Sequence, residues 1–127
     1  MPVMPQANPA DAFAECLRAC GAAPLRAAGV EILQMNITRR CNLACKHCHV
    51  QAGPERTEIM SQETMTHCLY AAAHRKITTI DITGGAPELH PDLEWLLGEA
   101  AALKKRLIVR SNLVVMRDPA YRRYMDL

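Results

Sequence analysis

The sequence predicts an α/β fold with parallel strands, the front portion of an α/β barrel, and two observations support this prediction. Short apolar segments suited to strands alternate with segments of helical periodicity over most of the 127 residues. Each expected helix connects one strand to the next, and strands joined in this way pair in parallel through right-handed crossovers. Half of the residues are hydrophobic, so the chain is able to bury a core.

The first element is expected to be a short helix that precedes the strands. Asn8 is suited to cap it with Pro9 in its first position, and Gly21 is suited to end it. We therefore expect a helical extension and linker over residues 1–29 and an incomplete core domain over residues 30–127.

The core is expected to contain three strands, two helices between them and the start of a further helix. The strands are expected at residues 30–38, 77–83 and 107–111. Caps and first-turn prolines mark where the helices begin, at Ser61, Pro91 and Asp118-Pro119. The buried stripe of the first helix is expected to be Met65, Cys68, Leu69, Ala72 and Ala73. That of the second is expected to be Leu93, Leu96, Leu97, Ala100 and Leu103.

The size of the expected sheet bears on how complete the domain is. A parallel sheet of three strands leaves both edges open, and parallel sheets are nearly always covered. A complete α/β barrel takes about 200 residues or more. We therefore expect these 127 residues to be the front portion of a larger barrel, with an independent three-stranded α/β sandwich as the alternative.

Composition argues against several classes of function. The net charge is only +2, and no basic stripe with interleaved aromatic residues suggests nucleic-acid binding. No apolar run approaches the roughly 20 residues that cross a bilayer, and the start lacks the regions of a secretory signal. Six cysteines then favour metal ligands or free thiols in a reducing, cytoplasmic setting.

The most specific motif is CxxxCxxC, formed by Cys41, Cys45 and Cys48 in the loop after the first strand. Structural zinc sites normally have four protein ligands, and iron–sulfur clusters usually have a cysteine on every iron. Three thiolates therefore leave one coordination position open, where another molecule can bind. The alternative is a zinc site completed by His47, His49 or a distant cysteine.

Two further loops are expected to lie beside the cysteines. A Gly84-Gly85-Ala86-Pro87 turn follows the second strand, and Ser111-Asn112 follow the third. Active sites of parallel α/β folds collect at the carboxyl ends of strands, and neighbouring strands lie about 4.8 Å apart. All three loops are therefore able to surround one small cofactor. The paired glycines would let the backbone approach a ligand closely.

With CxxxCxxC after the first strand and Gly-Gly-x-Pro after the second, the sequence resembles the radical S-adenosylmethionine (SAM) superfamily. The resemblance implies that Cys41, Cys45 and Cys48 hold a [4Fe-4S] cluster whose open iron binds the amino and carboxylate groups of SAM. It implies an enzyme that cleaves SAM to methionine and a 5′-deoxyadenosyl radical. An electron donor such as flavodoxin or ferredoxin and a small-molecule substrate are implied as partners.

The same resemblance implies which residues surround SAM, and it assigns no catalytic residue beyond the cluster ligands. The turn that receives the SAM amino group would be Gly84, Gly85, Ala86 and Pro87, with Glu88 at its end. Ser111 and Asn112 would contact the methionyl carboxylate or the ribose. His47 stands where members commonly have an aromatic residue near adenine, and Ala86 stands where many have Glu.

Two segments, residues 33–58 and 81–91, resemble the arsenosugar-biosynthesis radical SAM proteins in sequence. This similarity implies that the deoxyadenosyl group is joined to a dimethylated arsenic species. Members continue through further strands into a cysteine-bearing C-terminal domain, so the resemblance covers only the front of the family. The alternatives are a non-catalytic iron–sulfur or zinc-binding module and a truncated, inactive fragment.

The other candidate residues have two interpretations each. Cys16 and Cys20, four residues apart on the first helix, are candidates for a soft metal or arsenic(III), or else one packs and the other has no role. Cys68 is expected in the core. His49 and Arg56 are expected either to touch substrate or to order the loop.

Overall fold

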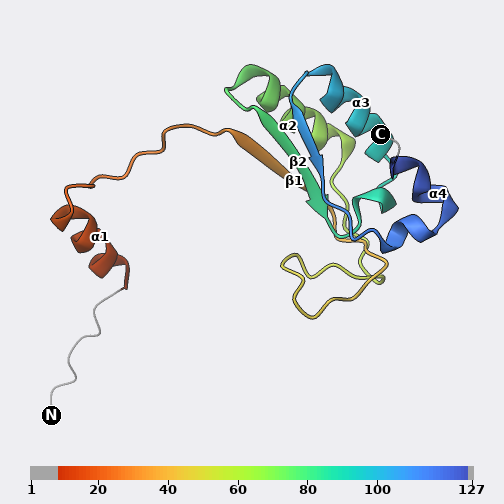
Figure 1. Cartoon of the computed structure of the whole chain (residues 1–127), viewed down its shortest axis with the longest axis horizontal. Helices are drawn as coiled ribbons and strands as arrows, with labels where there is room; N and C mark the ends of the chain where they lie inside the picture. The colour runs from red at the N-terminus through yellow and green to blue at the C-terminus, as the bar shows by residue number, and fades with distance from the viewer. Residues whose placement is uncertain (1–8, 126–127) are drawn as a thin grey trace, which may run out of the picture.

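A three-stranded parallel sheet forms the centre of the structure, a computed structural model that describes residues 9–125. The strands are β1 (Ile32–Thr38), β2 (Thr79–Gly84) and β3 (Arg106–Val109), and they lie side by side in chain order (Figure 1). Both pairings are parallel, so the predicted α/β class and strand direction are confirmed.

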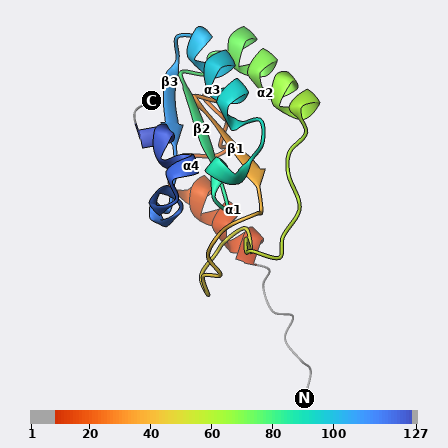
Figure 2. The same ribbon diagram turned by 90° about the vertical axis from the view of Figure 1, so that its right-hand side faces the viewer.

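Two helices cover one face of this sheet. Helix α2 (Gln62–His74) connects β1 to β2, and α3 (Leu93–Ala102) connects β2 to β3. Figure 2 shows both helices on the same side of the three strands, as two consecutive right-handed crossovers require. Apolar side chains from the strands and both helices form one core, which includes Met35, Ile37, Met65, Leu69, Ile80, Ile82, Leu93 and Leu96.

Helix α2 begins where the sequence predicts, because the Ser61 side chain accepts a hydrogen bond from the Thr64 backbone N–H at 3.2 Å. Met65, Leu69 and Ala72 are buried as expected. Cys68 is only partly buried against the core. The prediction for Ala73 is wrong: it is exposed, because it lies outside the face of α2 that packs against β1 and α3.

Helix α3 begins two residues later than Pro91, at Leu93 with Asp92 as its N-cap residue. The reason is His90, a buried side chain that organises this turn. Its Nδ1 accepts from the Asp92 backbone N–H at 3.0 Å, so Nε2 carries the proton and donates to the Met60 carbonyl at 2.9 Å. Leu93, Leu96 and Ala100 are buried as predicted.

The strands are shorter than the apolar segments that predict them. Pairing begins at the level where Ile32, Thr79 and Arg106 lie opposite one another. Val30 lies before that level and is 61% exposed, whereas Ile77 lies before β2 yet packs into the core. Apolar character alone therefore does not set the ends of a strand, which depend on having a pairing partner.

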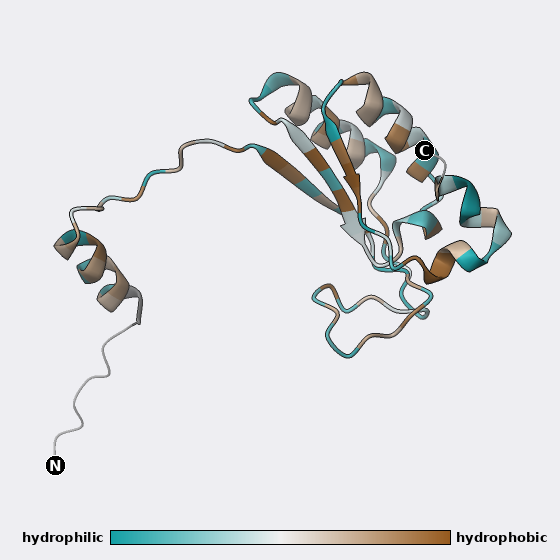
Figure 3. Cartoon of the chain, viewed as in Figure 1, coloured by the Kyte–Doolittle hydropathy of each residue, from teal (hydrophilic) through white to brown (hydrophobic). Residues whose placement is uncertain are grey.

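The face of the sheet opposite the helices is mostly polar. Gln34 of β1 lies opposite Asp81 of β2, and Asn36 lies opposite Thr83. The alternation between this polar face and the helix-covered face is visible along β2 in Figure 3. This face continues into the loops that follow the strands.

The predicted N-terminal helix is present as α1 (Pro9–Ala19), and its expected cap Asn8 lies outside the described residues. An extended segment separates α1 from the sheet (Figure 1), and Phe13 is 60% exposed. Cys16 and Cys20 are also exposed, and the Cys20 backbone N–H donates to the Cys16 carbonyl at 3.0 Å. Every helix within residues 9–125 is too short or too polar to span a membrane.

After β3 the chain forms short helical turns. Asp118 accepts a hydrogen bond from the Ala120 N–H at 2.9 Å and caps α4 (Pro119–Arg122), as predicted. The sequence reasoning missed the single-turn 3-10 helices, which have no apolar period of their own. They are η1 (Pro87–Leu89), η2 (Val114–Arg117) and η3 (Arg123–Met125).

The Gly84-Gly85 turn at the end of β2 packs directly against the backbone that leaves β1. Gly85 N–H donates to the Thr38 carbonyl at 2.7 Å, and Ala86 N–H donates to the Arg40 carbonyl at 2.9 Å. Gly84 has φ +142°, and a Cβ on it would overlap the Thr38 backbone. A Cβ on Gly85 would overlap the Arg40 backbone. The glycines thus join two strands closely, whatever they contribute to ligand binding.

Gly85→Ala is expected to destabilise the protein by about 1–3 kcal/mol, because the added methyl group must displace the Arg40 backbone. Gly98→Ala on α3 is the matched control: nothing lies within 4 Å of its Cβ position, so helix propensity should stabilise the protein by about 0.5–1 kcal/mol. Urea unfolding of both variants measures the difference. Equal stability of the two would contradict the close junction.

Candidate functional site

The loop between β1 and α2 carries the three cysteines, and backbone hydrogen bonds close it at its base. Arg39 N–H donates to the Glu58 carbonyl at 2.9 Å, and Gly53 N–H donates to the Arg39 carbonyl at 3.1 Å. Cys41 N–H then donates to the Gly53 carbonyl at 3.2 Å. The loop therefore extends beyond the carboxyl ends of the strands as a closed lobe (Figure 1).

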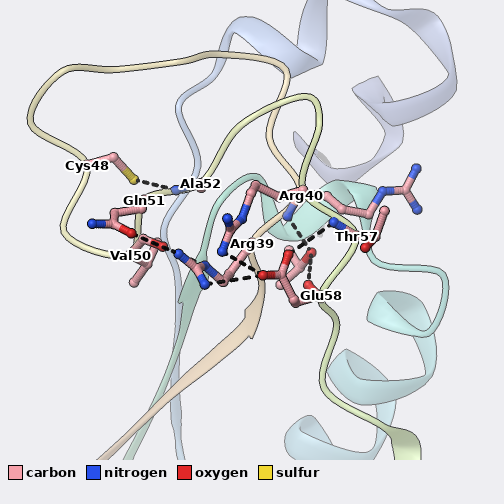
Figure 4. Close-up of polar contacts among 10 residues, drawn as sticks. Arg39, Arg40, Cys48, Val50, Gln51, Ala52, Thr57 and Glu58 are labelled. Atoms are coloured by element: carbon pink, nitrogen blue, oxygen red, sulfur yellow. Dashed lines mark hydrogen bonds and ion pairs between the residues drawn. The ribbon is translucent and has the colours of Figure 1, made fainter.

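The Arg39 side chain holds this lobe together from within (Figure 4). Its Nε donates to the Val50 carbonyl at 2.7 Å, and its Nη2 donates to Gln51 Oε1 at 3.3 Å. Its Nη1 pairs with Glu58 Oε1 at 3.2 Å, and Arg56 reaches the same oxygen at 2.6 Å. Arg56 therefore orders the loop, which is one of the two roles expected for it.

Glu58 is the acceptor at the centre of these contacts. Backbone hydrogen bonds and the positive charges of Arg56 and Arg39 lower the pKa of Glu58, although partial desolvation acts in the opposite direction. The carboxylate is thus ionised in neutral solution and keeps both arginines at the base of the lobe.

A hollow of about 410 Å³ lies between the lobe and the ends of the strands, and all three cysteines line it. The loops after β2 and β3 reach the same hollow, as expected from their places in the sheet. Residues that the sequence predicts for the site and that line the hollow are Cys41, Cys45, Cys48, His47, Gly84, Gly85 and Asn112; His49 also lines it.

The remaining predicted residues lie elsewhere. Ala86 and Pro87 are buried behind the turn, where Ala86 packs with Cys41 and Ala52. Glu88 and Ser111 line a different cavity of about 770 Å³, whose walls include apolar residues of α3 and β3. Ser111 Oγ accepts a hydrogen bond from Leu113 N–H at 3.0 Å. Only part of the predicted set therefore shares the cysteine hollow.

The surroundings of two sulfur atoms suit thiolate ligands. Ala52 N–H donates to Cys48 Sγ at 3.2 Å, and Asn112 Nδ2 donates to Cys41 Sγ at 3.5 Å. Such donors stabilise negative charge on sulfur and tune iron–sulfur clusters. Soft thiolate ligands also favour iron–sulfur clusters or zinc over harder ions. The chemistry of this donor set fits a cluster with one open iron.

The cysteines surround the hollow without yet converging. Within residues 9–125, no three His, Cys, Asp or Glu side chains lie close enough to hold a metal ion as arranged. Cys41 is buried, Cys48 is half-buried and Cys45 is exposed. Binding a cluster therefore requires the three cysteine side chains to come closer together.

An ion pair on the polar face of the sheet joins Asp81, which is buried, to Arg110, which is largely exposed and lines the hollow. Arg110 Nε donates to Asp81 Oδ1 at 2.9 Å, and its Nη2 donates to Asp81 Oδ2 at 2.7 Å. These hydrogen bonds and the Arg110 charge lower the pKa of Asp81 against the opposing effect of its burial. Sequence reasoning missed the pair, although an acidic residue inside an apolar strand signals the need for a partner.

Three thiols around a hollow at the carboxyl edge of a parallel α/β sheet are a donor set suited to a metal or an iron–sulfur cluster. Residues 35–127 match the sequence profile of the Radical SAM superfamily, and the chain belongs to that superfamily. Its members are enzymes that use a [4Fe-4S] cluster and SAM.

Curated relatives carry out different reactions. The chain is 31% identical over 81 residues to the antilisterial bacteriocin subtilosin biosynthesis protein AlbA of Bacillus subtilis, covering 64% of this chain and 18% of that protein. It is 34% identical over 82 residues to pre-heme d1 synthase of Dinoroseobacter shibae, covering 61% and 19%. It is 33% identical over 92 residues to a probable GTP 3′,8-cyclase of Methanopyrus kandleri, covering 72% and 29%. The matched region thus spans less than a third of each of these relatives.

Asp81→Asn is expected to lower the free energy of unfolding at neutral pH and to make that free energy depend less on pH in the acid range. Because the pKa of Asp81 is lowered in the folded state, the ion pair stabilises the fold fully above the ordinary aspartate pKa of about 3.9. This contribution is lost as the pH falls through the lowered pKa of the folded state. Urea unfolding from pH 7 to pH 3 should show the two proteins converging. Arg110→Gln should behave similarly, and a gap that is constant with pH would contradict this assignment.

Glu88→Met is expected to stabilise the protein by about 1–3 kcal/mol, because Glu88 is 2% exposed and neither carboxylate oxygen has a hydrogen-bond partner within residues 9–125. Glu94→Met at the rim of the same cavity is the control, since this carboxylate is exposed and pairs only with Arg123 at the surface. Thermal unfolding compares them. Destabilisation by Glu88→Met would mean that the carboxylate is used.

Proposed function

We propose that this chain binds a [4Fe-4S] cluster through Cys41, Cys45 and Cys48 and holds SAM beside it. The observation that carries the proposal is that the three thiols share one hollow with the Gly84-Gly85 turn. A zinc site has no need of such a turn on the neighbouring strand, whereas a second small molecule bound at an open iron needs a surface close to the cysteines.

We assign the contacts to SAM to the part of the predicted set that lines this hollow. Gly84 and Gly85 are half-buried and line the hollow, and their backbone is the part of the turn to which we assign the SAM amino group. His47 lines the same hollow, and we assign it the contact with the adenine. Ala86 and Pro87 support the turn from behind, and we assign no SAM contact to Ser111 or Glu88.

The bound cluster supplies one-electron reduction of SAM, which yields methionine and a 5′-deoxyadenosyl radical. The task of the protein is to bind both groups, orient them and keep water away. The proposed core covers residues 30–127, with residues 1–29 as an extension. A small reducing protein such as flavodoxin or ferredoxin would donate the electron, in a cytoplasmic setting that keeps the thiols reduced.

For the substrate we propose a dimethylated arsenic species that accepts the deoxyadenosyl group. The support is the similarity of residues 33–58 and 81–91 to arsenosugar-biosynthesis proteins. The curated relatives act in bacteriocin, heme d1 and GTP-cyclisation reactions, so what they share with this chain is the SAM-dependent step. The activity and substrate of the whole protein are part of this proposal.

Anaerobic reconstitution of the wild-type chain with iron and sulfide is expected to give brown protein with about four irons per chain. Replacing Cys41, Cys45 or Cys48 by Ala should abolish the colour. Cys68→Ala is the matched control, because Cys68 lies on α2 against the core, and this variant should retain the iron. Iron analysis and visible absorption measure both effects.

Two outcomes would contradict the proposal. Colourless protein with one bound zinc would indicate a structural metal site. A cluster whose electron paramagnetic resonance spectrum does not change when SAM is added would indicate an electron-transfer module instead.

A further inference from the structure

We infer that Asn112 is a positioning residue for the cluster: its side-chain amide donates a hydrogen bond to the sulfur of Cys41 and raises the reduction potential of the bound cluster. This inference rests on the proposed function. It reassigns Asn112, which the family resemblance placed against the methionyl carboxylate or the ribose of SAM.

The orientation of the Asn112 amide follows from its backbone neighbours. Its Oδ1 lies 2.9 Å from Val114 N and 3.2 Å from Val115 N, and both of these are N–H donors. The atom facing them must therefore be the oxygen. The amide nitrogen then points the other way, to Asn42 Oδ1 at 2.8 Å and Cys41 Sγ at 3.5 Å.

These contacts use the full hydrogen-bonding capacity of the side chain. The oxygen accepts two hydrogen bonds, and the two amide hydrogens go to Asn42 and Cys41. No donor or acceptor of the side chain remains for the carboxylate or ribose of SAM. The geometry thus favours a role toward the sulfur.

The contact with Cys41 should become stronger when the sulfur binds iron. A Cys41 S–H group is also within 3.9 Å of Asn42 Oδ1, but that contact needs the thiol proton. A thiolate has no proton to donate, so the Asn112 N–H is the contact that persists. Hydrogen bonds to an ionised acceptor are roughly twice as strong as neutral ones.

The backbone of the turn holds Asn112 in place. Leu113, the next residue, has φ +61°, a left-handed conformation that is uncommon for residues other than glycine. Such conformations persist when the surroundings enforce them. Here the two N–H groups bound to Asn112 Oδ1 enforce the turn, and the turn lets Asn112 reach a cysteine 71 residues earlier in the chain.

The expected effect on the reduction potential of the cluster follows from the negative charge that reduction adds. Reduction adds negative charge that spreads over the ligand sulfurs, and an N–H donor stabilises it. Cys41 is 8% exposed, so water does little to replace a lost donor. Removing the Asn112 N–H should therefore make the cluster harder to reduce.

The test compares Asn112→Asp and Asn112→Ala with wild type in the full 127-residue chain, reconstituted anaerobically. Asn112→Asp keeps an oxygen for Val114 and Val115 but replaces the donor with a negative charge. Asp118→Ala is the matched control, since it removes a similar side-chain cap at the next turn without touching Cys41. Redox titration gives the midpoint potential, and iron analysis gives the loading.

We expect all three variants to hold iron, with the potential shifted negatively in Asn112→Ala, further in Asn112→Asp, and unchanged in Asp118→Ala. If the added carboxylate in Asn112→Asp repels the cluster and lowers the iron loading, the midpoint potential of Asn112→Ala alone is compared with wild type. Wild-type potential in loaded Asn112→Ala overturns the inference, as does loss of iron from folded Asn112→Ala.

Weakened SAM binding in Asn112→Ala, with the potential before SAM addition unchanged, would also overturn the inference in favour of a SAM contact. Wild-type protein that takes up no cluster is a separate outcome. It contradicts the proposed function itself, whereas a loaded wild type with unaffected variants contradicts only the role of Asn112.

Discussion

The arrangement of the whole site depends on one close backbone approach, between the Gly84-Gly85 turn and the exit from β1. Two hydrogen bonds, from Gly85 to Thr38 and from Ala86 to Arg40, connect the end of β2 to the residues just before Cys41. Neither contact is possible with a side chain in the way. The first cysteine of the motif is therefore fixed relative to the neighbouring strand by main-chain geometry.

The other parts of the site are arranged around this fixed point. Arg39 and Glu58 close the base of the lobe, and Asn112 reaches Cys41 from the far strand. Cys45, at the middle of the motif, is exposed, whereas Cys41 is buried and Cys48 is half-buried.

The sequence was most informative where a pattern has a direct physical cause. Ser61 and Asp118 cap helices because short polar side chains accept from free N–H groups, and the crossover rule gave the parallel sheet. It was least informative where a side chain finds a partner far along the chain. His90 with Met60, Arg110 with Asp81 and Asn112 with Cys41 are separated by 30, 29 and 71 residues.

Glu88 and Ser111 illustrate the same limit within the site. Both follow strands at positions that the family pattern places near SAM, yet their side chains turn toward the cavity on the helix-covered side. Position along a strand end predicts which edge of the sheet a residue occupies. The local path of the backbone, here a 3-10 turn at Pro87–Leu89, decides which side of that edge its side chain reaches.

The polar face of the sheet has a consequence for how the chain behaves while it folds. Gln34, Asn36, Thr83 and the Asp81–Arg110 pair occupy the face that the helices leave uncovered. An apolar face there would expose hydrophobic surface to other chains while the protein folds, and such surface favours aggregation. Because Gln34 and Asn36 are exposed to water, the uncovered face of the sheet presents little apolar surface to other chains.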